Sequence, residues 1–241
     1  MAKQVVLING PMGSGKTALV QFIKAHPKMF DSYLKGWEEK DRLVTVSFEQ
    51  TPPKALGLFY KKDLSKKDIS ANTDLFELSM GVGRVVDYLD GKYSNGLLFL
   101  DQSLISGAET YGKNSFGQGN LTHQTRNLYQ SLLELGIDRL GRNEQEQWCE
   151  QLIVYLRIKD PEILLRRIRQ RATPGEVVGL EYLTQMIKVN EKFITDKDDC
   201  YTKYGLNPPR VLTIDASEDF TQNGFYHRQV VEQIIAKLKE G

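Results

Sequence analysis

The most restrictive feature of the sequence is an eight-residue segment, GPMGSGKT, at positions 10–17. It matches the pattern G-x-x-x-x-G-K-[ST] in full, and it lies between an apolar run at 4–9 and a stretch with helical spacing at 17–25. In this strand–loop–helix context, glycines allow backbone N–H groups to turn toward phosphate oxygens, and the helix start adds the positive end of its dipole. The segment predicts a phosphate-binding P-loop, and the flanking strand and helix make a chance glycine turn the weaker alternative.

Two side chains of this loop have expected roles. Lys16 is predicted to reach the terminal phosphates of a nucleoside triphosphate, and the hydroxyl of Thr17 is predicted to bind Mg²⁺. The residues expected to contact the phosphates are Gly10, Met12, Gly13, Ser14, Gly15, Lys16 and Thr17.

Strand and helix patterns alternate along the rest of the chain. The further strand candidates lie at 43–48, 97–100, 152–158 and 211–214, and several are continuous apolar runs, as in parallel strands that are covered on both faces. Helical spacing occurs at roughly 54–62, 74–90, 121–140, 161–171, 180–195 and 225–239. The pattern predicts an α/β fold, a doubly wound five-stranded parallel sheet flanked by helices, in one domain over residues 1–241.

Composition limits the classes of partner. The 32 Lys and Arg residues balance 31 Asp and Glu residues, so no global charge favours nucleic acid or an anionic membrane, and an acidic ligand must be held locally. Two cysteines are too few for a disulfide framework or a zinc cage. With no apolar run near the roughly 20 residues of a membrane span and no signal-peptide layout, we expect a soluble protein of a reducing compartment, cytoplasmic or mitochondrial-matrix.

Charged side chains suggest further parts of a phosphate site. Asp101 ends the third strand, where a P-loop protein needs a carboxylate for its metal, although a turn or N-cap role is the alternative. Arg167 and Arg171 share a helical face in a basic run that leads into 172–176. We predict an arginine-rich lid at about 166–179 that neutralises transferring phosphate, with a solvated charged face as the alternative.

Taken in their order along the chain, short segments of this sequence resemble those of the deoxynucleoside kinase family, which includes the deoxycytidine, deoxyguanosine and deoxyadenosine kinases. The resemblance extends over most of the chain and depends on the P-loop, FEQ at 48–50, LFY at 58–60, FE at 76–77, Arg84, DQS at 101–103, YLR at 155–157, RIRQRA at 167–172, GLEYL at 179–183, VLTID at 211–215 and EDF at 218–220.

The resemblance implies a P-loop kinase that transfers the γ-phosphoryl group of ATP, or another nucleoside triphosphate, to the 5′-hydroxyl of a deoxynucleoside. Glu49 would be the general base, with a solvent-facing carboxylate as the alternative, and Lys16, Arg167 and Arg171 would stabilise the transferring group. Thr17 and Asp101 would hold Mg²⁺. The remaining implied contacts are Tyr60 and Glu176 to the 3′-hydroxyl, Glu77, Arg84 and Gln102 to the acceptor, and Glu218, Asp219 and Phe220 to the donor base. By analogy, a homodimer is expected.

Four positions depart from the family pattern, and all of them concern the acceptor. The family's arginine after the strand-end acid is Gln102, its second lid arginine aligns with Thr173, its acidic residue past Ser103 is Gly107, and its base-reading glutamine is Glu77. These changes predict an altered acceptor geometry.

Glu77 is the departure with a chemical consequence. An ionised carboxylate offers acceptors only, which suits the two adjacent donors of guanine, and glycines at 81, 83 and 107 are expected to leave room for a larger base. A purine preference with deoxyguanosine ahead of deoxycytidine follows, unless Glu77 instead pairs with Arg84, seven residues on and on the same helical face.

Two other functions fit the P-loop. One is a kinase of the same fold that acts on a nucleotide or an unusual acceptor, and the other is a nucleotide-binding switch or ATPase module. A GTPase would be expected to show an N-K-x-D motif, which the sequence lacks, and a switch leaves Glu49 without a role.

Overall fold

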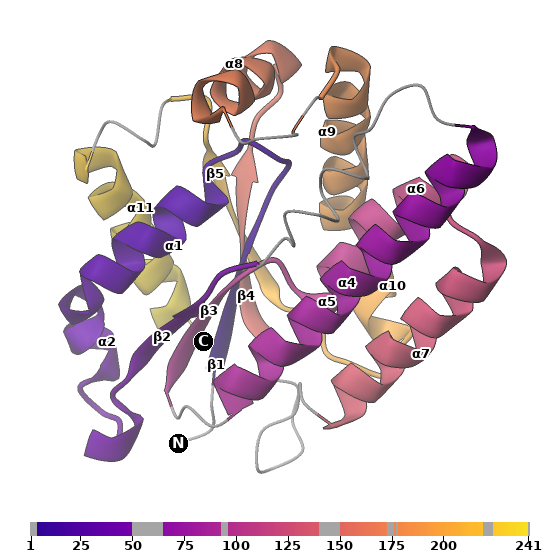
Figure 1. Ribbon diagram of the computed structural model, residues 1–241. Coiled ribbons are helices and arrows are strands. Elements are labelled where there is room, and N and C mark those ends of the chain that lie inside the picture. Colours follow the sequence, from indigo (N-terminus) through magenta and orange to yellow (C-terminus); the bar gives the residue numbers. More distant parts are fainter. Residues whose placement is uncertain are drawn as a thin grey trace.

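Five strands form one parallel sheet in the order β2-β3-β1-β4-β5, with helices on both faces (Figure 1). The computed structural model describes residues 4–49, 65–92, 96–139, 150–172, 176, 178–218 and 224–240. The strands are β1 (Gln4–Asn9), β2 (Val44–Ser47), β3 (Leu97–Asp101), β4 (Glu150–Arg157) and β5 (Arg210–Asp215).

The helices connect these strands. The α-helices are α1 (Lys16–Ala25), α2 (Asp31–Leu34), α4 (Lys66–Lys92), α5 (Leu104–Gly107), α6 (Lys113–Gly117), α7 (His123–Arg139), α8 (Pro161–Arg171), α9 (Leu180–Thr195), α10 (Lys197–Thr202) and α11 (Gly224–Lys239). The 3₁₀ turns are η1 (Pro27–Phe30) and η2 (Glu39–Asp41), and η3 (Ala108–Gly112) is a π-helical segment between α5 and α6.

The central strand shows why the middle of a buried strand is apolar. Val6 and Ile8 of β1 point into one core with α1, α8 and α11, whereas Val5 and Leu7 point into a second core with α5 and α7. Because residues 5–8 are buried on both faces of the sheet, this part of β1 has no solvent-facing position for a polar residue. Figure 1 shows α1, α2 and α11 on one side of the sheet and α4, α5 and α7 on the other.

The predicted fold class is confirmed: the sheet has five parallel strands flanked by helices. Each predicted strand is present, with bounds that match or differ by at most two residues. The helix expected at 74–90 begins earlier, at Lys66, because charged residues of its first turns conceal the apolar period. The sequence did not predict α5, η3 and α6, which are short, and the helix expected at 54–62 lies outside the described residues.

Within the described part of the chain, none of the helices has the length and apolar character needed to cross a membrane.

Candidate active site

The P-loop lies between the end of β1 and the start of α1. Gly13 and Gly15 have φ angles of 81° and 99°, in the left-handed region that favours glycine. The amide of Ser14 donates to the carbonyl of Pro11 over 3.1 Å, which closes the turn, and α1 begins at Lys16. The motif glycines therefore build a turn that leads directly into a helix N-terminus, as the sequence predicts.

Lys16 lies back over this loop. Its Nζ donates to the carbonyl of Gly10 at 3.0 Å and to that of Pro11 at 3.3 Å. These contacts hold the ammonium group at the loop that phosphate is expected to enter.

Thr17 and Asp101 meet although 84 positions separate them in the sequence. The Thr17 hydroxyl donates to Oδ2 of Asp101 over 2.7 Å, and Oδ1 is buried without a partner among the described residues. Burial raises the pKa of Asp101, and the charge of Lys16 opposes this shift. The two groups offer the hydroxyl and carboxylate oxygens that Mg²⁺ prefers.

This pair is not a complete metal cage. The residues that the structure describes include no group of three or more His, Cys, Asp or Glu side chains that could hold an ion. A Mg²⁺ ion bound by one or two protein oxygens, with phosphate and water as its other ligands, fits such a pair.

Glu49 pairs with Arg84. The Nε and Nη2 atoms of Arg84 donate to Oε1 of Glu49 over 3.0 and 2.6 Å, and Nη1 donates to the hydroxyl of Tyr129 over 2.6 Å. Arg84 is 3% exposed and Glu49 is 20% exposed. Burial alone would lower the pKa of Arg84, but Tyr129, Glu49 and Glu77 outweigh it and keep the pKa raised. Glu49 also acts on the pKa of Asp101, so the predicted base lies near the predicted metal ligand.

Two of the three glycines expected to leave room for a base do not do so. A Cβ atom at Gly107 would lie 2.3 Å from Nη1 of Arg84, and one at Gly81 would lie 2.9 Å from the ring of Tyr129. Side chains of the protein already occupy these two spaces, so Gly81 and Gly107 do not make room for a larger base.

Glu77 takes its hydrogen bond from another helix. The hydroxyl of Ser115 donates to Oε1 of Glu77 over 2.7 Å, and Oε2 has no partner among the described residues. Glu77 is 1% exposed, and this burial raises its pKa, while Ser115 and Arg84 oppose the shift. The alternative in which Glu77 pairs with Arg84 is not what the structure shows, because the guanidinium donates to Glu49 and Tyr129.

Gln102 has an unusual backbone. Its φ angle is 79°, which is uncommon for a residue with a Cβ atom, and it lies between β3 and α5. The next residue, Ser103, caps α5 by exchanging hydrogen bonds with Ser106. Both polar atoms of the Gln102 amide are buried without a partner in the described part of the chain. Gln102 therefore holds an unsatisfied donor and acceptor beside Asp101.

The two arginines of the predicted lid have different partners. Nη2 of Arg171 lies 2.6 Å from both carboxylate oxygens of Glu176, and the charge of Arg171 also acts on the pKa of Asp101. Arg167 instead donates to the carbonyls of Ser217 and Glu218, over 3.0 and 2.6 Å. Glu176, expected at the 3′-hydroxyl, is thus paired with Arg171, and Arg167 contacts the segment expected at the donor base.

Several groups near Glu49 were missed by the sequence analysis. Tyr111 lies in η3, and burial raises its pKa, with a further contribution from Glu49. Tyr182 of α9 also has a pKa raised by burial, and the charges of Glu77 and Glu176 add to the shift. Tyr129 and Ser115 become visible only through their hydrogen bonds to Arg84 and Glu77. No sequence signal marks them beyond their aromatic or hydroxyl character.

Some predicted residues cannot be placed. Tyr60, Thr173, Asp219 and Phe220 lie outside the described residues.

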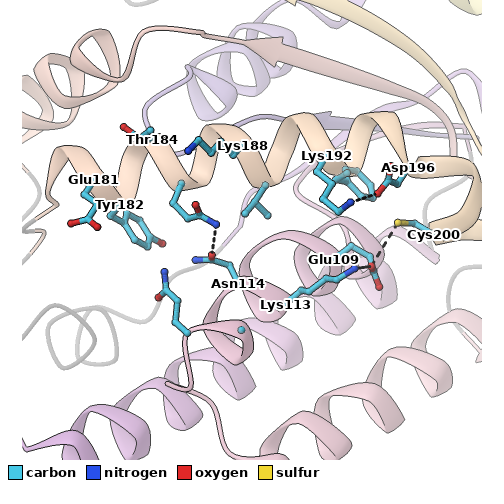
Figure 2. A pocket seen from close by; sticks show the side chains of 15 residues that line it. Glu109, Lys113, Asn114, Glu181, Tyr182, Thr184, Lys188, Lys192, Asp196 and Cys200 are labelled. Carbon is cyan, nitrogen blue, oxygen red and sulfur yellow. Dashed lines mark hydrogen bonds and ion pairs between the residues drawn. The ribbon is translucent and has the colours of Figure 1, made fainter.

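A separate groove of about 920 Å³ lies between α9 and the segment 109–118 (Figure 2). Its acidic and basic side chains pair with each other, as in Lys192 with Asp196 and Lys113 with Glu109. The groove includes neither the P-loop nor Glu49, so we assign the phosphate chemistry to the carboxyl edge of the sheet.

Comparison with known proteins gives a family and a fold. The family model described as deoxynucleoside kinase matches residues 6–239. Two structures of deoxyadenosine kinase from M. mycoides have a similar fold, one with the products dCMP and a flexible dCDP bound and one with dCTP bound. Their TM-scores are 0.61 and 0.60, at 18% and 17% sequence identity, and each comparison covers 99% of this chain and 100% of the other. No curated protein matches the chain.

Proposed function

Because the chain belongs to the deoxynucleoside kinase family, we propose that it transfers the γ-phosphoryl group of ATP, or another nucleoside triphosphate, to the 5′-hydroxyl of a deoxynucleoside. The observation that carries this proposal is the hydrogen bond from Thr17 to Asp101 at one edge of the sheet, where the charges of Lys16 and Glu49 both act on Asp101. In-line transfer to an alcohol needs a phosphate-binding cation and a general base on either side of the same phosphoryl group.

The residues have distinct roles in this proposal. The P-loop amides and Lys16 bind the donor phosphates, and Glu49 accepts the proton of the attacking hydroxyl. Arg171 stabilises charge on the transferring group. Thr17 and Asp101 would hold Mg²⁺, partly through water, and the ion would supply positive charge to the donor phosphates.

The acceptor is a deoxynucleoside, and we propose that purines are preferred. Glu77 supports this because its unpartnered oxygen faces no donor among the described residues, so a base can supply one. The similar structures are of deoxyadenosine kinases, which also supports a deoxynucleoside acceptor.

A product panel tests the proposal. The protein is incubated with MgATP and each of the four deoxynucleosides in turn, with deoxynucleoside monophosphates as further acceptors, and products are separated chromatographically. We expect ADP and a new 5′-monophosphate in equal amounts. ADP with inorganic phosphate alone would show an ATPase or switch, and diphosphate products alone would show a nucleotide kinase.

We also propose that the protein is a homodimer. Helices α4 and α7 pack side by side (Figure 1). Both carry exposed apolar side chains, namely Leu75, Val82 and Val86 of α4 and Leu128 and Leu135 of α7. Seven-residue spacing places Leu128 and Leu135 on one face of α7. Light scattering after size-exclusion chromatography should give twice the chain mass of 27.5 kDa, and Leu135→Glu should give a monomer.

A further inference from the structure

Glu49 has one cationic partner in the described part of the chain, and it is Arg84. We propose that Arg84 is a positioning residue that orients the Glu49 carboxylate for proton transfer, and that Tyr129 and Gly107 keep the guanidinium in place. This inference rests on the proposed role of Glu49 as the general base.

The contacts on Glu49 are asymmetric. Arg84 donates from both Nε and Nη2, and both hydrogen bonds end on Oε1. Two donors converging on one oxygen fix the rotation of the carboxylate, because a turn about its axis breaks both. The arrangement leaves Oε2 as the atom to accept the proton of the acceptor hydroxyl.

The guanidinium is itself held from the other side. Its Nη1 donates to the hydroxyl of Tyr129 on α7, so three donors of the planar group are used on two partners. Tyr129 is buried, and its hydroxyl lies where a lysine at position 84 could not satisfy both partners. The planar fork of arginine therefore links α7 to the end of β2.

Gly107 supplies the space for this fork. A Cβ atom there would lie 2.3 Å from Nη1, 2.5 Å from Cζ and 2.8 Å from Nε of Arg84. All three are guanidinium atoms, so any side chain at position 107 displaces the group that donates to Glu49. The absence of a side chain at 107 is thus a requirement of the Arg84–Glu49 contact.

Within the described part of the chain, two neighbouring groups of the site do not replace the cation at position 84. Gln102, which follows the strand-end carboxylate, carries a neutral amide whose polar atoms contact none of the described residues. Lys16 is held at the P-loop carbonyls.

The first test places Arg84 variants in two backgrounds. In the wild-type background, Arg84→Lys and Arg84→Ala should lower kcat by up to about 10²-fold, as expected when a catalytic group is misplaced. The KM for ATP should change by less than about threefold, because the donor site is intact. Glu49→Gln alone should lower kcat by about 10²–10⁴-fold.

The combined variants decide the inference. If Arg84 acts through Glu49, adding Arg84→Lys to Glu49→Gln lowers kcat no further. If the two losses multiply, Arg84 acts independently of Glu49 and the inference is wrong. A wild-type protein that phosphorylates no deoxynucleoside would instead overturn the proposed function, and the inference with it.

The second test is steric, and it has a matched control. Gly107→Ala should lower kcat in the wild type but have little effect with Lys at position 84, where there is no guanidinium to displace. The control is Gly117→Ala in α6, where a Cβ atom meets nothing within 4 Å. Equal loss from Gly107→Ala in both backgrounds would show a packing role only and contradict the inference. Thermal unfolding of each variant confirms that it is folded.

Discussion

The proposed donor and acceptor sides of the site are built in different ways. The donor side is one contiguous segment, in which backbone angles at Gly13 and Gly15 place amides and Lys16 before any distant contact is made. The acceptor side consists of single side chains from several elements, and each is held by a partner from another: Arg84 by Tyr129, and Glu77 by Ser115. The geometry of a contiguous motif is set by its own residues. A pocket built from paired side chains can instead bind a different acceptor when one member of a pair is replaced.

The largest expected effect is on the donor side. Lys16→Ala should lower kcat/KM for any acceptor by more than about 10³-fold, because the charge at the terminal phosphates is lost. Donor binding, measured with a fluorescent ATP analogue, should weaken as well. Lys28→Ala, at an exposed position after α1, is the control and should retain full activity. If Lys16→Ala lowered kcat/KM for only some acceptors, Lys16 would also affect acceptor choice. The division into a donor and an acceptor side would then be wrong.

The lid arginine connects the two sides. Arg171→Ala should lower kcat by about 10²-fold and change the Kd of ATP much less, because its charge acts chiefly on the transferring group. Steady-state kinetics together with equilibrium binding separate the two parameters. Arg169→Ala, at an exposed position of the same helix, should leave both unchanged. Equal losses in kcat and in affinity for Arg171→Ala would indicate simple ground-state binding.

On the acceptor side, the choice of base should depend on pH through Glu77. Burial raises the pKa of Glu77, and the groups around it are Ser115, Arg84 and Glu49. Below that pKa the neutral acid offers one donor and one acceptor, which suits the N1 and amino edge of adenine; above it, the carboxylate suits the two donors of guanine. The ratio of kcat/KM for deoxyadenosine to that for deoxyguanosine should therefore fall by about tenfold as pH rises.

Glu77→Gln provides the check on this prediction. A glutamine side chain does not titrate, so the ratio of kcat/KM for deoxyadenosine to that for deoxyguanosine should become independent of pH and favour deoxyadenosine. The same substitution should stabilise the protein at neutral pH, since a carboxyl whose folded pKa is raised loses its stabilising contribution as pH rises through that pKa. A wild-type preference for thymidine or deoxycytidine at every pH would contradict a purine-reading role for Glu77.

The smallest effect is expected for an ion pair that belongs to neither the donor side nor the acceptor side. Arg157 donates to both oxygens of Glu191 over 2.7 and 3.2 Å, and the two side chains are 41% and 32% exposed. Solvent screens such a pair, so Arg157→Ala should change the free energy of unfolding by less than about 1 kcal/mol and leave kcat unchanged. Denaturant titration measures the first quantity. A tenfold loss of kcat would show instead that Arg157, at the end of β4, belongs to the donor side.

The sequence predicts the fold, and the turn from β1 into α1 at residues 10–17, for physical reasons. Residues 97–100 are apolar because both faces of β3 are buried. Few arrangements other than a central parallel strand bury both faces of so short an apolar segment. The alternative in which Glu77 pairs with Arg84 failed because seven-residue spacing shows that they share a helix face but not which groups face them. Arg84 instead reaches Glu49, 35 positions earlier, and Tyr129, 45 positions later.

Gly107 shows the same limit of prediction from the sequence. A glycine in the sequence indicates a missing side chain but not what fills the space, and a long side chain from α4 fills it here. Tyr111 was missed because the π-helical turn of η3 shifts its direction relative to an α-helix, and no local pattern marks that turn.

The backbone of Gln102 sets up a trade-off between stability and activity. Holding a residue with a Cβ atom in the left-handed region costs about 1–3 kcal/mol. Burying its amide without partners adds to this cost. Glycine would remove both costs, so stability alone does not explain the glutamine. A ligand that hydrogen-bonds the amide would recover part of this free energy on binding.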